Sequence, residues 1–306
     1  MSTFIQNIDK SVAALYIICV MDGEITAAEL AVRRRAEDSL VKKFKKTMFS
    51  RFAKAVATYE LIQPNDKIAV CISGGKDSFA MAKLFQQLKK HNKFPFELEF
   101  LVMDPGYSEA HRKTIEDNAR VLGIPITIFQ TEIFDNVFQI EKSPCYICAR
   151  MRRGYLYAKA RELGCNKIAL GHHYDDVIET ILMGMLYGGQ MQTMMPKLKS
   201  TNFSGMQLIR PMYLVREADI VAWRDHCDLR FLRCACRFTE NIASAAADDR
   251  ETNSKRQKVK ELIASLKNDD PEIEQNIFKS PENVNLCTVI EYKDKSGVRH
   301  RFTDDY

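Results

Sequence analysis

The sequence predicts an α/β fold built on a doubly wound, parallel, five-stranded sheet. Short apolar runs rich in β-branched residues alternate along the chain with amphipathic segments of helical length. Glycine and proline residues separate these segments, as they do at turns. A chain of 306 residues, 46% hydrophobic and 28% charged, can bury one α/β core and still carry extensions. Strands joined through helices of this length run parallel, with right-handed crossovers.

Five apolar runs predict the strands of this sheet, and helices are expected between and after them. The expected strands are residues 67–72, 96–103, 124–130, 167–170 and 207–209. The expected helices are residues 79–90, 107–122, 145–163, a segment rich in Ile, Leu and Met after residue 176, and 217–227. Gly123, just before Pro125, predicts the end of the second helix. We therefore expect one domain at residues 61–240.

A helical, basic segment is expected before this domain, at residues 1–60. Thr26, followed three residues later by Glu29, predicts the N-cap of a helix. Residues 41–60 predict a basic amphipathic helix, because apolar residues recur at every fourth position. These apolar residues are Phe44, Met48, Phe52 and Val56.

A C-terminal extension is expected at residues 241–306. Residues 248–267 have the pattern of a charged helix with one apolar side. Residues 286–302 alternate around a turn at residues 294–297, which predicts a β-hairpin.

The net charge is only +5, but the basic residues are concentrated in two clusters. The clusters are Arg33, Arg34, Arg35, Lys42, Lys43, Lys45, Lys46, Arg51 and Lys54, and then Arg150, Arg152 and Arg153. Such clusters suit a polyanion, although a solvated helix face is the commoner cause of a charge run.

Cysteine usage favours a reducing compartment. Nine cysteines, an odd number, in a chain far larger than a small secreted domain indicate reduced thiols, metal ligation or catalysis, and hence a cytoplasmic protein. The apolar run at residues 12–21 is too short to cross a bilayer and lacks the flanks of a signal peptide, so no membrane partner is expected.

One six-residue string between the first strand and its helix carries the strongest chemical signal. The string is Ser73-Gly74-Gly75-Lys76-Asp77-Ser78, called here the phosphate loop. Two glycines allow a tight turn and close approach to a ligand, and the first amides of the following helix favour an anion. The serine hydroxyls and Lys76 add to a phosphate cradle, and Asp77 can hold a Mg²⁺. The alternative is a simple glycine-rich turn.

Three more candidate residues follow the strands at the same edge of the sheet. Ligands of open α/β sheets bind beyond the carboxyl ends of the strands, where the strand order reverses. Asp104 ends the second strand and can accept from a ribose or adenine, while Gly171 and His172 follow the fourth. Asp175 and Asp176 begin the next helix, where capping and a role in magnesium or nucleotide binding have equal weight. A metal site at His172 and His173 is not expected, because adjacent residues point apart.

Cys145 and Cys148 are the candidate metal ligands, with a third among Cys234 and Cys236. The pair lies at a helix start, which lowers thiol pKa and favours thiolates. Spacing alone leaves open a zinc site, a redox pair, or a [4Fe–4S] cluster on three cysteines with one iron free for a substrate sulfur. The remaining thiols are interpreted as buried or incidental. They are Cys19, Cys71, Cys165, Cys227 and Cys287.

The phosphate loop resembles that of the PP-loop ATP pyrophosphatases, and the ordered motifs resemble the TtcA family of tRNA 2-thiocytidine synthetases. Those motifs are the phosphate loop, Cys145-x-x-Cys148-x-x-x-Arg152-Arg153-Gly154, Gly171-His172-His173-x-Asp175-Asp176, and Ile209-Arg210-Pro211 with Glu217. The resemblance covers about residues 41–236. It implies a PP-loop, adenine nucleotide alpha hydrolase-like fold. It also implies that ATP and Mg²⁺ adenylate the cytidine at position 32 of the tRNA anticodon loop, and that sulfur from a [4Fe–4S] cluster displaces AMP.

The resemblance also implies roles and partners. Lys76 and Asp77 are the catalytic candidates, and the cluster ligands map onto Cys145, Cys148 and the third cysteine. The family's Pro-Cys-x-x-Cys is replaced here by Leu-Arg-Cys-Ala-Cys, and the preceding residues favour Cys234 over Cys236. Implied partners are tRNA and a sulfur donor such as a cysteine desulfurase, and a homodimer is compatible with the pattern.

Three other functions are compatible with parts of the pattern. The first is thiolation of a tRNA uridine, although the enzymes that do this carry additional CxxC pairs. The second is adenylation of a small molecule for amidation. The third is a zinc-stabilised regulatory module without catalysis.

Overall fold

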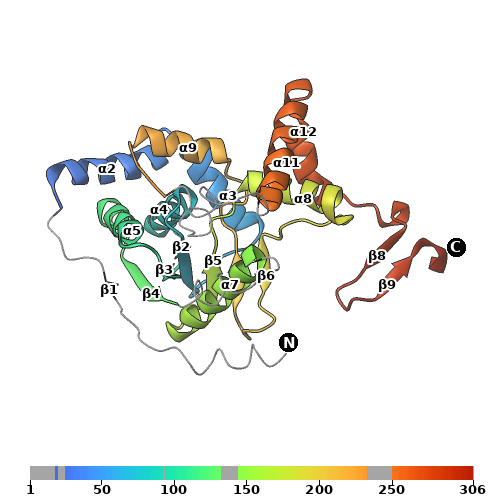
Figure 1. Cartoon of the computed structure of the whole chain (residues 1–306), viewed down its shortest axis with the longest axis horizontal. Coiled ribbons are helices and arrows are strands. Elements are labelled where there is room, and N and C mark those ends of the chain that lie inside the picture. Colours follow the sequence, from blue (N-terminus) through green and yellow to red (C-terminus); the bar gives the residue numbers. More distant parts are fainter. Residues whose placement is uncertain (1–17, 20–24, 92–93, 132–143, 233–249, 306) are drawn as a thin grey trace. The chain divides into compact units, whose positions relative to one another are not determined.

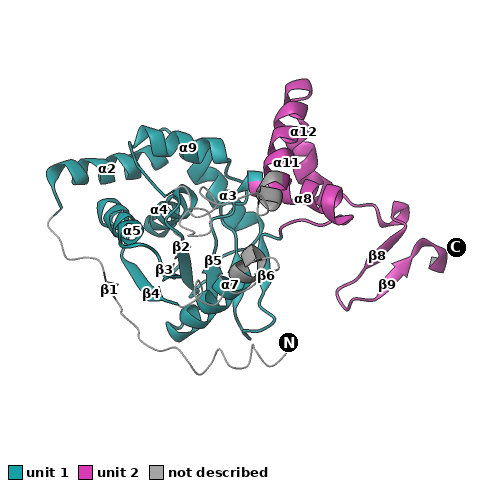
Figure 2. Ribbon diagram, in the orientation of Figure 1, with its two compact units in different colours: residues 1–175, 195–247 teal, residues 176–194, 248–306 magenta. Residues whose placement is uncertain are grey.

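The computed structural model describes residues 18–19, 25–91, 94–131, 144–232 and 250–305 (Figure 1). The chain divides into two compact units. The first consists of residues 1–175 and 195–247, and the second of residues 176–194 and 248–306 (Figure 2).

The first unit contains a seven-stranded sheet in the order β1-β4-β3-β2-β5-β7-β6. The five predicted strands are confirmed and run parallel to their neighbours. They are β2 (Lys67–Ile72), β3 (Glu97–Asp104), β4 (Ile126–Gln130), β5 (Lys167–Ala169) and β7 (Gln207–Ile209). The predicted total of five was too low. Two short edge strands, β1 (Ile18–Cys19) and β6 (Lys197–Lys199), pair antiparallel with β4 and β7.

The order of the parallel strands creates a switch point between β2 and β5. The chain passes from β2 to β3 and β4 on one side, and then returns to β5 and β7 on the other side of β2. Crevices that bind ligands form at such a reversal, beyond the carboxyl ends of the strands. The phosphate loop follows β2, and Gly171 lies two residues beyond the end of β5. The phosphate loop and Gly171 therefore lie at the switch point, where the ligand site was predicted.

Helices cover both faces of the sheet, which explains the nearly continuous apolar runs of the strands. In β2, Ile68, Val70 and Ile72 join one buried cluster, whereas Ala69 and Cys71 join another. The first cluster includes residues of α2 (Ala27–Val41), α4 (Lys76–Lys90), α5 (Glu109–Leu122) and α9 (Glu217–His226). The second includes residues of α7 (Pro144–Glu162). The predicted doubly wound arrangement is confirmed.

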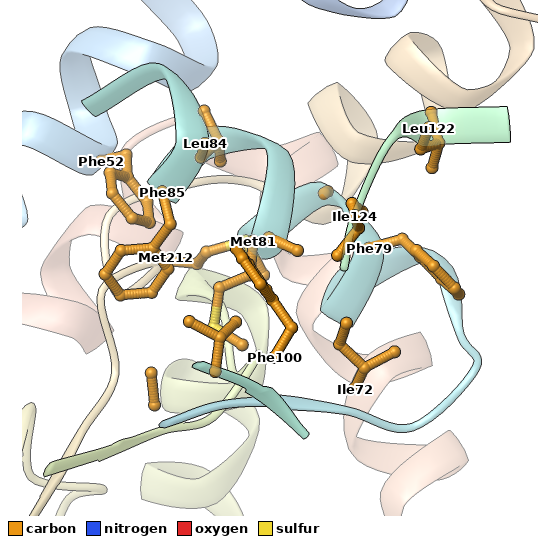
Figure 3. Packing of buried hydrophobic residues seen from close by; sticks show 14 of the residues in the cluster. Phe52, Ile72, Phe79, Met81, Leu84, Phe85, Phe100, Leu122, Ile124 and Met212 are labelled. Atoms are coloured by element: carbon orange, nitrogen blue, oxygen red, sulfur yellow. The ribbon is translucent and has the colours of Figure 1, made fainter. Parts of the chain in front are cut away.

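The first of these clusters packs against α4, the helix that follows the phosphate loop. Phe79, Met81, Leu84 and Phe85 of α4 belong to this cluster, which Figure 3 shows together with Ile72 of β2 and Phe100 of β3. The ring of Phe85 meets Phe52 edge to face, with centroids 5.2 Å apart. Because α4 starts at Lys76, this packing fixes the end of the phosphate loop against the core.

The basic N-terminal segment is helical, but it is broken where one helix was predicted. Thr26 caps α2, and its capping box with Glu29 is confirmed. A π-helical turn, Lys45–Phe49, then precedes α3 (Ser50–Thr58), so the continuous helix over residues 41–60 was wrong. The four apolar residues that predicted it are nevertheless buried. They are Phe44, Met48, Phe52 and Val56.

Lys83 joins the N-terminal segment to the core. Its side chain is fully buried, and its Nζ donates to Glu37 Oε1 at 2.7 Å and to the Leu122 carbonyl oxygen at 2.8 Å. Arg33 of α2 donates in addition to two carbonyl groups at the end of α5. A helix C-terminus attracts cations, so these contacts hold α2 against α4 and α5.

The second unit is built from the main part of α8 (Tyr174–Gly188), α11 (Arg250–Asp269), α12 (Ile273–Lys279) and a hairpin. Arg256 of α11 forms ion pairs with Asp176 and with the buried Glu179 of α8. The hairpin is confirmed as β8 (Glu291–Lys293) and β9 (Arg299–Arg301), whereas α12 was not predicted. Within the described residues, the model has no helix that combines the length and apolarity needed to cross a membrane.

Candidate nucleotide-binding site

The phosphate loop turns tightly between β2 and α4. Gly74 has a φ of +89°, and a Cβ at this position would lie 3.0 Å from side-chain atoms of Ile115 and Leu232, so a larger residue would be strained and crowded. Ser78 closes the turn, because its hydroxyl donates to the Gly75 carbonyl at 2.9 Å and accepts from the Ser73 amide at 3.2 Å. Among the described residues, no side chain caps α4, so its first amides are available to an anion.

Lys76, the first residue of α4, lies between two carboxylates. Its Nζ is 3.1 Å from Asp77 Oδ1 and 3.0 Å from Glu217 Oε1. Burial lowers the pKa of the Lys76 ammonium, but the two carboxylates outweigh burial and the pKa is raised above its usual value. Lys76 therefore stays positively charged near neutral pH, as its predicted role as a phosphate ligand requires.

Asp175 connects the loop after β5 to the start of α9. Its Oδ2 accepts from the Glu217 amide at 2.7 Å, and its Oδ1 is 3.1 Å from Arg216 Nη2. The capping role that was one of two expectations for Asp175 is thus performed on α9 and not on its own helix. Sequence reasoning included Glu217 in the motif that carries the family resemblance but assigned it no role, and it did not single out Arg216.

His173 lies beside the phosphate loop. It is buried, with Nε2 3.9 Å from Asp77 Oδ1 and Nδ1 3.7 Å from Asp175 Oδ2. His172, the predicted nucleotide ligand, is half-buried beside it. Within the described part of the chain, no group of three or more His, Cys, Asp or Glu side chains is placed to hold a metal ion.

Gly171 approaches the phosphate loop as predicted. A Cβ at this position would lie 3.3 Å from the Ser78 amide nitrogen and 3.4 Å from the Asp77 carbonyl carbon. These neighbours are backbone atoms at the start of α4. The ends of β2 and β5 are therefore in contact, and Gly171 leaves the room that a side chain would take.

Asp104 is engaged in its own loop. One carboxylate oxygen accepts from the Gly106 amide at 2.9 Å and the Tyr107 amide at 2.7 Å, and the other lies 3.8 Å from Arg112 Nη1. The side chain is almost fully buried. This carboxylate shapes the exit of β3, and its predicted contact with a ribose or adenine stays a prediction.

The candidate cysteines are only partly within the described structure. Helix α7 begins at Pro144, so position 145 lies in its first turn and position 148 at the start of its second turn. Cys234 and Cys236 lie outside the described residues. The two residues that precede this segment contact the phosphate loop and its helix: the Leu232 amide donates to the Gly74 carbonyl at 3.3 Å, and Phe231 stacks on Phe79 with centroids 5.1 Å apart.

Three other cysteines have the properties of structural thiols. Cys71, Cys165 and Cys227 are free and buried, as expected, whereas Cys287 is exposed. Burial raises the pKa of the Cys71 thiol to about 12 and that of Cys165 to about 11. Thiols with such pKa values stay protonated and unreactive near neutral pH.

A positively charged surface lies along α2, the π-helical turn and α3. Its exposed basic residues are Arg34, Arg35, Lys42, Lys43, Lys45, Lys46 and Lys54. Arg33 and Arg51 are half-buried, and Arg51 Nη1 lies 3.9 Å from Asp219 Oδ2. Most of the first predicted cluster is therefore accessible to a polyanion.

Comparison with known proteins places these features in a family. A model of the PP-loop domain matches residues 43–236. A tRNA-cytidine(32) 2-sulfurtransferase from Syntrophotalea carbinolica is 34% identical over 251 residues, covering 81% of this chain and 91% of the relative. The tRNA-cytidine(32) 2-sulfurtransferase 1 of Francisella philomiragia is 35% identical, covering 80% and 92%.

The fold has a counterpart among solved structures. The U34-tRNA thiolase NcsA from Methanococcus maripaludis, solved with its [4Fe-4S] cluster, superimposes with a TM-score of 0.59 at 21% sequence identity. The similarity covers 78% of this chain and 82% of that one. It confirms the predicted fold class.

Proposed function

The chain belongs to the PP-loop family and, within it, to the tRNA-cytidine(32) 2-sulfurtransferases, and we propose from this that it converts a tRNA cytidine to 2-thiocytidine with ATP. In the first step, the C2 oxygen of the base attacks the α-phosphorus of ATP, and pyrophosphate leaves with the electron pair of the broken P–O bond. In the second step, a sulfur nucleophile forms a bond to C2, and AMP leaves with the former carbonyl oxygen.

The observation that carries this proposal is the phosphate loop at the switch point of the sheet. The amides of the first turn of α4 and the Lys76 ammonium bind the β- and γ-phosphates, where negative charge builds up as pyrophosphate departs. Asp77 would hold a Mg²⁺ ion, which would offset the remaining phosphate charge. Gly171 lets the nucleotide approach the backbone beyond β5. Lys76 and Asp77 are thus the catalytic residues of the adenylation step.

The cysteine set suits a [4Fe–4S] cluster on three ligands. Cys145 and Cys148 lie three residues apart at the start of α7, and Cys234 follows a segment that contacts the phosphate loop. When bound, such a cluster keeps one iron open and supplies a site that accepts and delivers sulfur. The thiolase from M. maripaludis carries a [4Fe-4S] cluster on the same fold. A sulfur donor such as a cysteine desulfurase would then replenish the sulfur.

The basic surface on α2, the π-helical turn and α3 is the proposed contact with the tRNA backbone. Lysine and arginine side chains that neutralise phosphates release counterions, so the affinity for tRNA should fall steeply as salt rises. Arg150 and Arg153, which are exposed on α7, form a second proposed contact with tRNA near the cysteine segment of the same helix.

Metal analysis of anaerobically purified protein tests the cluster. We expect about four irons and four sulfides per chain in the wild type, and loss of both in Cys145→Ala, Cys148→Ala and Cys234→Ala. Cys236→Ala is the matched control and should keep its iron. About one zinc per chain without sulfide would contradict the sulfur-transfer step and leave only the ATP site. Loss of iron in Cys236→Ala but not in Cys234→Ala would reassign the third ligand.

A further inference from the structure

Glu217 reaches the lysine of the phosphate loop from a distant part of the chain. It lies 141 residues after Lys76, and its Oε1 is 3.0 Å from Lys76 Nζ. The two side chains are 25% and 21% exposed, so water screens this contact only in part. Since Asp77 lies 3.1 Å from the same nitrogen, two carboxylates surround the cation that a phosphate group must reach.

The position of Glu217 is fixed independently of Lys76. Glu217 is the first residue of α9, and its amide donates to Asp175 Oδ2. Arg216 binds the other oxygen of Asp175 and lies over the Tyr174 ring, with its guanidinium carbon 4.6 Å from the centroid. The start of α9 is therefore anchored to the segment after β5, and Glu217 extends from this anchor to the phosphate loop.

We propose that Glu217 is a positioning residue that competes with the polyphosphate for Lys76. The inference rests on the proposed function of the phosphate loop. A carboxylate at 3.0 Å neutralises part of the lysine charge, and a phosphate must displace it to take the full interaction. The same competition weakens the binding of pyrophosphate after the adenylation step and favours its release.

The direction in which Glu217→Gln changes the affinity for pyrophosphate follows from the negative charge of pyrophosphate. Pyrophosphate carries several negative charges, and Glu217 adds another within the same partly buried site. Glu217→Gln removes that charge and keeps nearly the same shape, whereas Asp77 continues to hold Lys76. The substitution should therefore tighten pyrophosphate binding. A residue that merely supported the loop would weaken binding when replaced.

The test is calorimetric titration of inorganic pyrophosphate into the full chain, with and without Mg²⁺. We expect the Kd of Glu217→Gln to fall about five- to tenfold in both conditions, the order expected for one charge at a partly buried site. Glu217→Asp keeps the charge and should stay closer to the wild type. Glu99→Gln is the control, because Glu99 is 32% exposed and pairs with Lys67 at 2.9 Å, at the opposite end of β2.

Different results of this titration would contradict the competition by Glu217 and the proposed function of the phosphate loop. A higher or unchanged Kd for Glu217→Gln without Mg²⁺ would overturn the competition. Weaker binding only with Mg²⁺ would also overturn it, since Glu217 would then be a metal ligand. Failure of the wild-type protein to bind pyrophosphate at all would contradict the proposed function itself, and this result is distinguishable because no variant is needed to see it.

Discussion

The Cβ that Gly171 lacks would lie 3.3 Å from the amide nitrogen of Ser78. Gly171 belongs to the segment after β5 and Ser78 to the first turn of α4, and these two segments meet where the strand order reverses. Backbone atoms cannot move aside as a flexible side chain can. The phosphate loop therefore depends on the absence of a side chain in a neighbouring segment.

Gly171→Ala should weaken ATP binding more than it destabilises the fold. The added methyl group must push the start of α4 by a few tenths of an ångström, which costs about 1 kcal/mol or more when a site is already packed. We expect a Kd for ATP about tenfold higher or more, measured by calorimetry. Gly188→Ala is the control, because a Cβ there has no neighbour within 4 Å among the described residues. Equal affinity in both variants would contradict the close approach.

Replacement of Glu37 should destabilise the first unit. Lys83 is fully buried, so Glu37→Gln leaves a buried ammonium without its counter-charge, at a cost of about 3 kcal/mol. Asp38→Asn is the control on the same helix, because its partner Lys42 is exposed and the pair contributes less than about 1 kcal/mol. Chemical denaturation measures both free energies of unfolding. A loss below about 1 kcal/mol in Glu37→Gln would show that the buried pair contributes no more than a surface pair.

The contribution of Glu37 to the free energy of unfolding should also depend on pH. Burial raises the pKa of this carboxyl, but the Lys83 and Lys90 ammonium groups outweigh burial and lower it from 4.5. The unfolded chain therefore takes up the proton at a higher pH than the folded chain does. The stabilisation is complete above pH 4.5 and is lost as pH falls through the lower, folded pKa. The difference in unfolding free energy between wild type and Glu37→Gln should shrink on acidification, and a constant difference down to the folded pKa would contradict the assignment.

Neutralising the exposed lysines of the π-helical turn should reduce the salt dependence of tRNA binding. Lys45→Gln and Lys46→Gln each remove one phosphate contact, so the slope of log K against log salt should change by about 1 for each. Filter binding over a series of salt concentrations gives these slopes. Lys113→Gln, on an exposed side chain of α5, should leave the slope unchanged. Equal slopes for all variants would place the tRNA contact elsewhere.

Phe231→Leu should reduce iron loading while pyrophosphate binding is kept. Phe231 stacks on the buried Phe79, and loss of this stacking costs about 1 kcal/mol and loosens the segment before Cys234. The amides of α4 that bind phosphate stay in place. Iron content and pyrophosphate affinity are measured on the same preparation. Phe203→Leu breaks a comparable stacked pair with Tyr157 and is the control. Iron loading equal to that of the control would show that the stacking does not support the cysteine segment.

Local sequence patterns predicted most of the fold and the centre of the site. The parallel strands are rich in apolar residues because both faces of the sheet are buried, and the six residues of the phosphate loop are contiguous. The two edge strands were missed because they have two and three residues and are defined only by pairing with β4 and β7. The π-helical turn was missed because apolar residues at every fourth position also fit a single helix.

The contacts that organise the site could not be predicted from local patterns. Glu217 meets Lys76 across 141 residues, and Asp175 caps a helix that starts 42 residues later. A capping residue near a helix start is normally assigned to that helix. Asp175 instead accepts from the first amide of α9, which the tertiary packing brings close to it. His173 lies near the phosphate loop, with Nε2 3.9 Å from Asp77 Oδ1, and sequence reasoning assigned it no role, because a strand end does not reveal which of two adjacent side chains points to a neighbouring loop.

The most direct test of the account is the nucleoside product formed on unmodified tRNA. The reconstituted protein is incubated anaerobically with tRNA, ATP, Mg²⁺ and a sulfide source, and the digested tRNA is analysed by mass spectrometry. We predict 2-thiocytidine that requires ATP, with one AMP and one pyrophosphate released per thiolated base, and no product from Lys76→Ala. Thiolated uridine in place of thiocytidine, or ATP cleavage without any thiolated base, would contradict the proposed function.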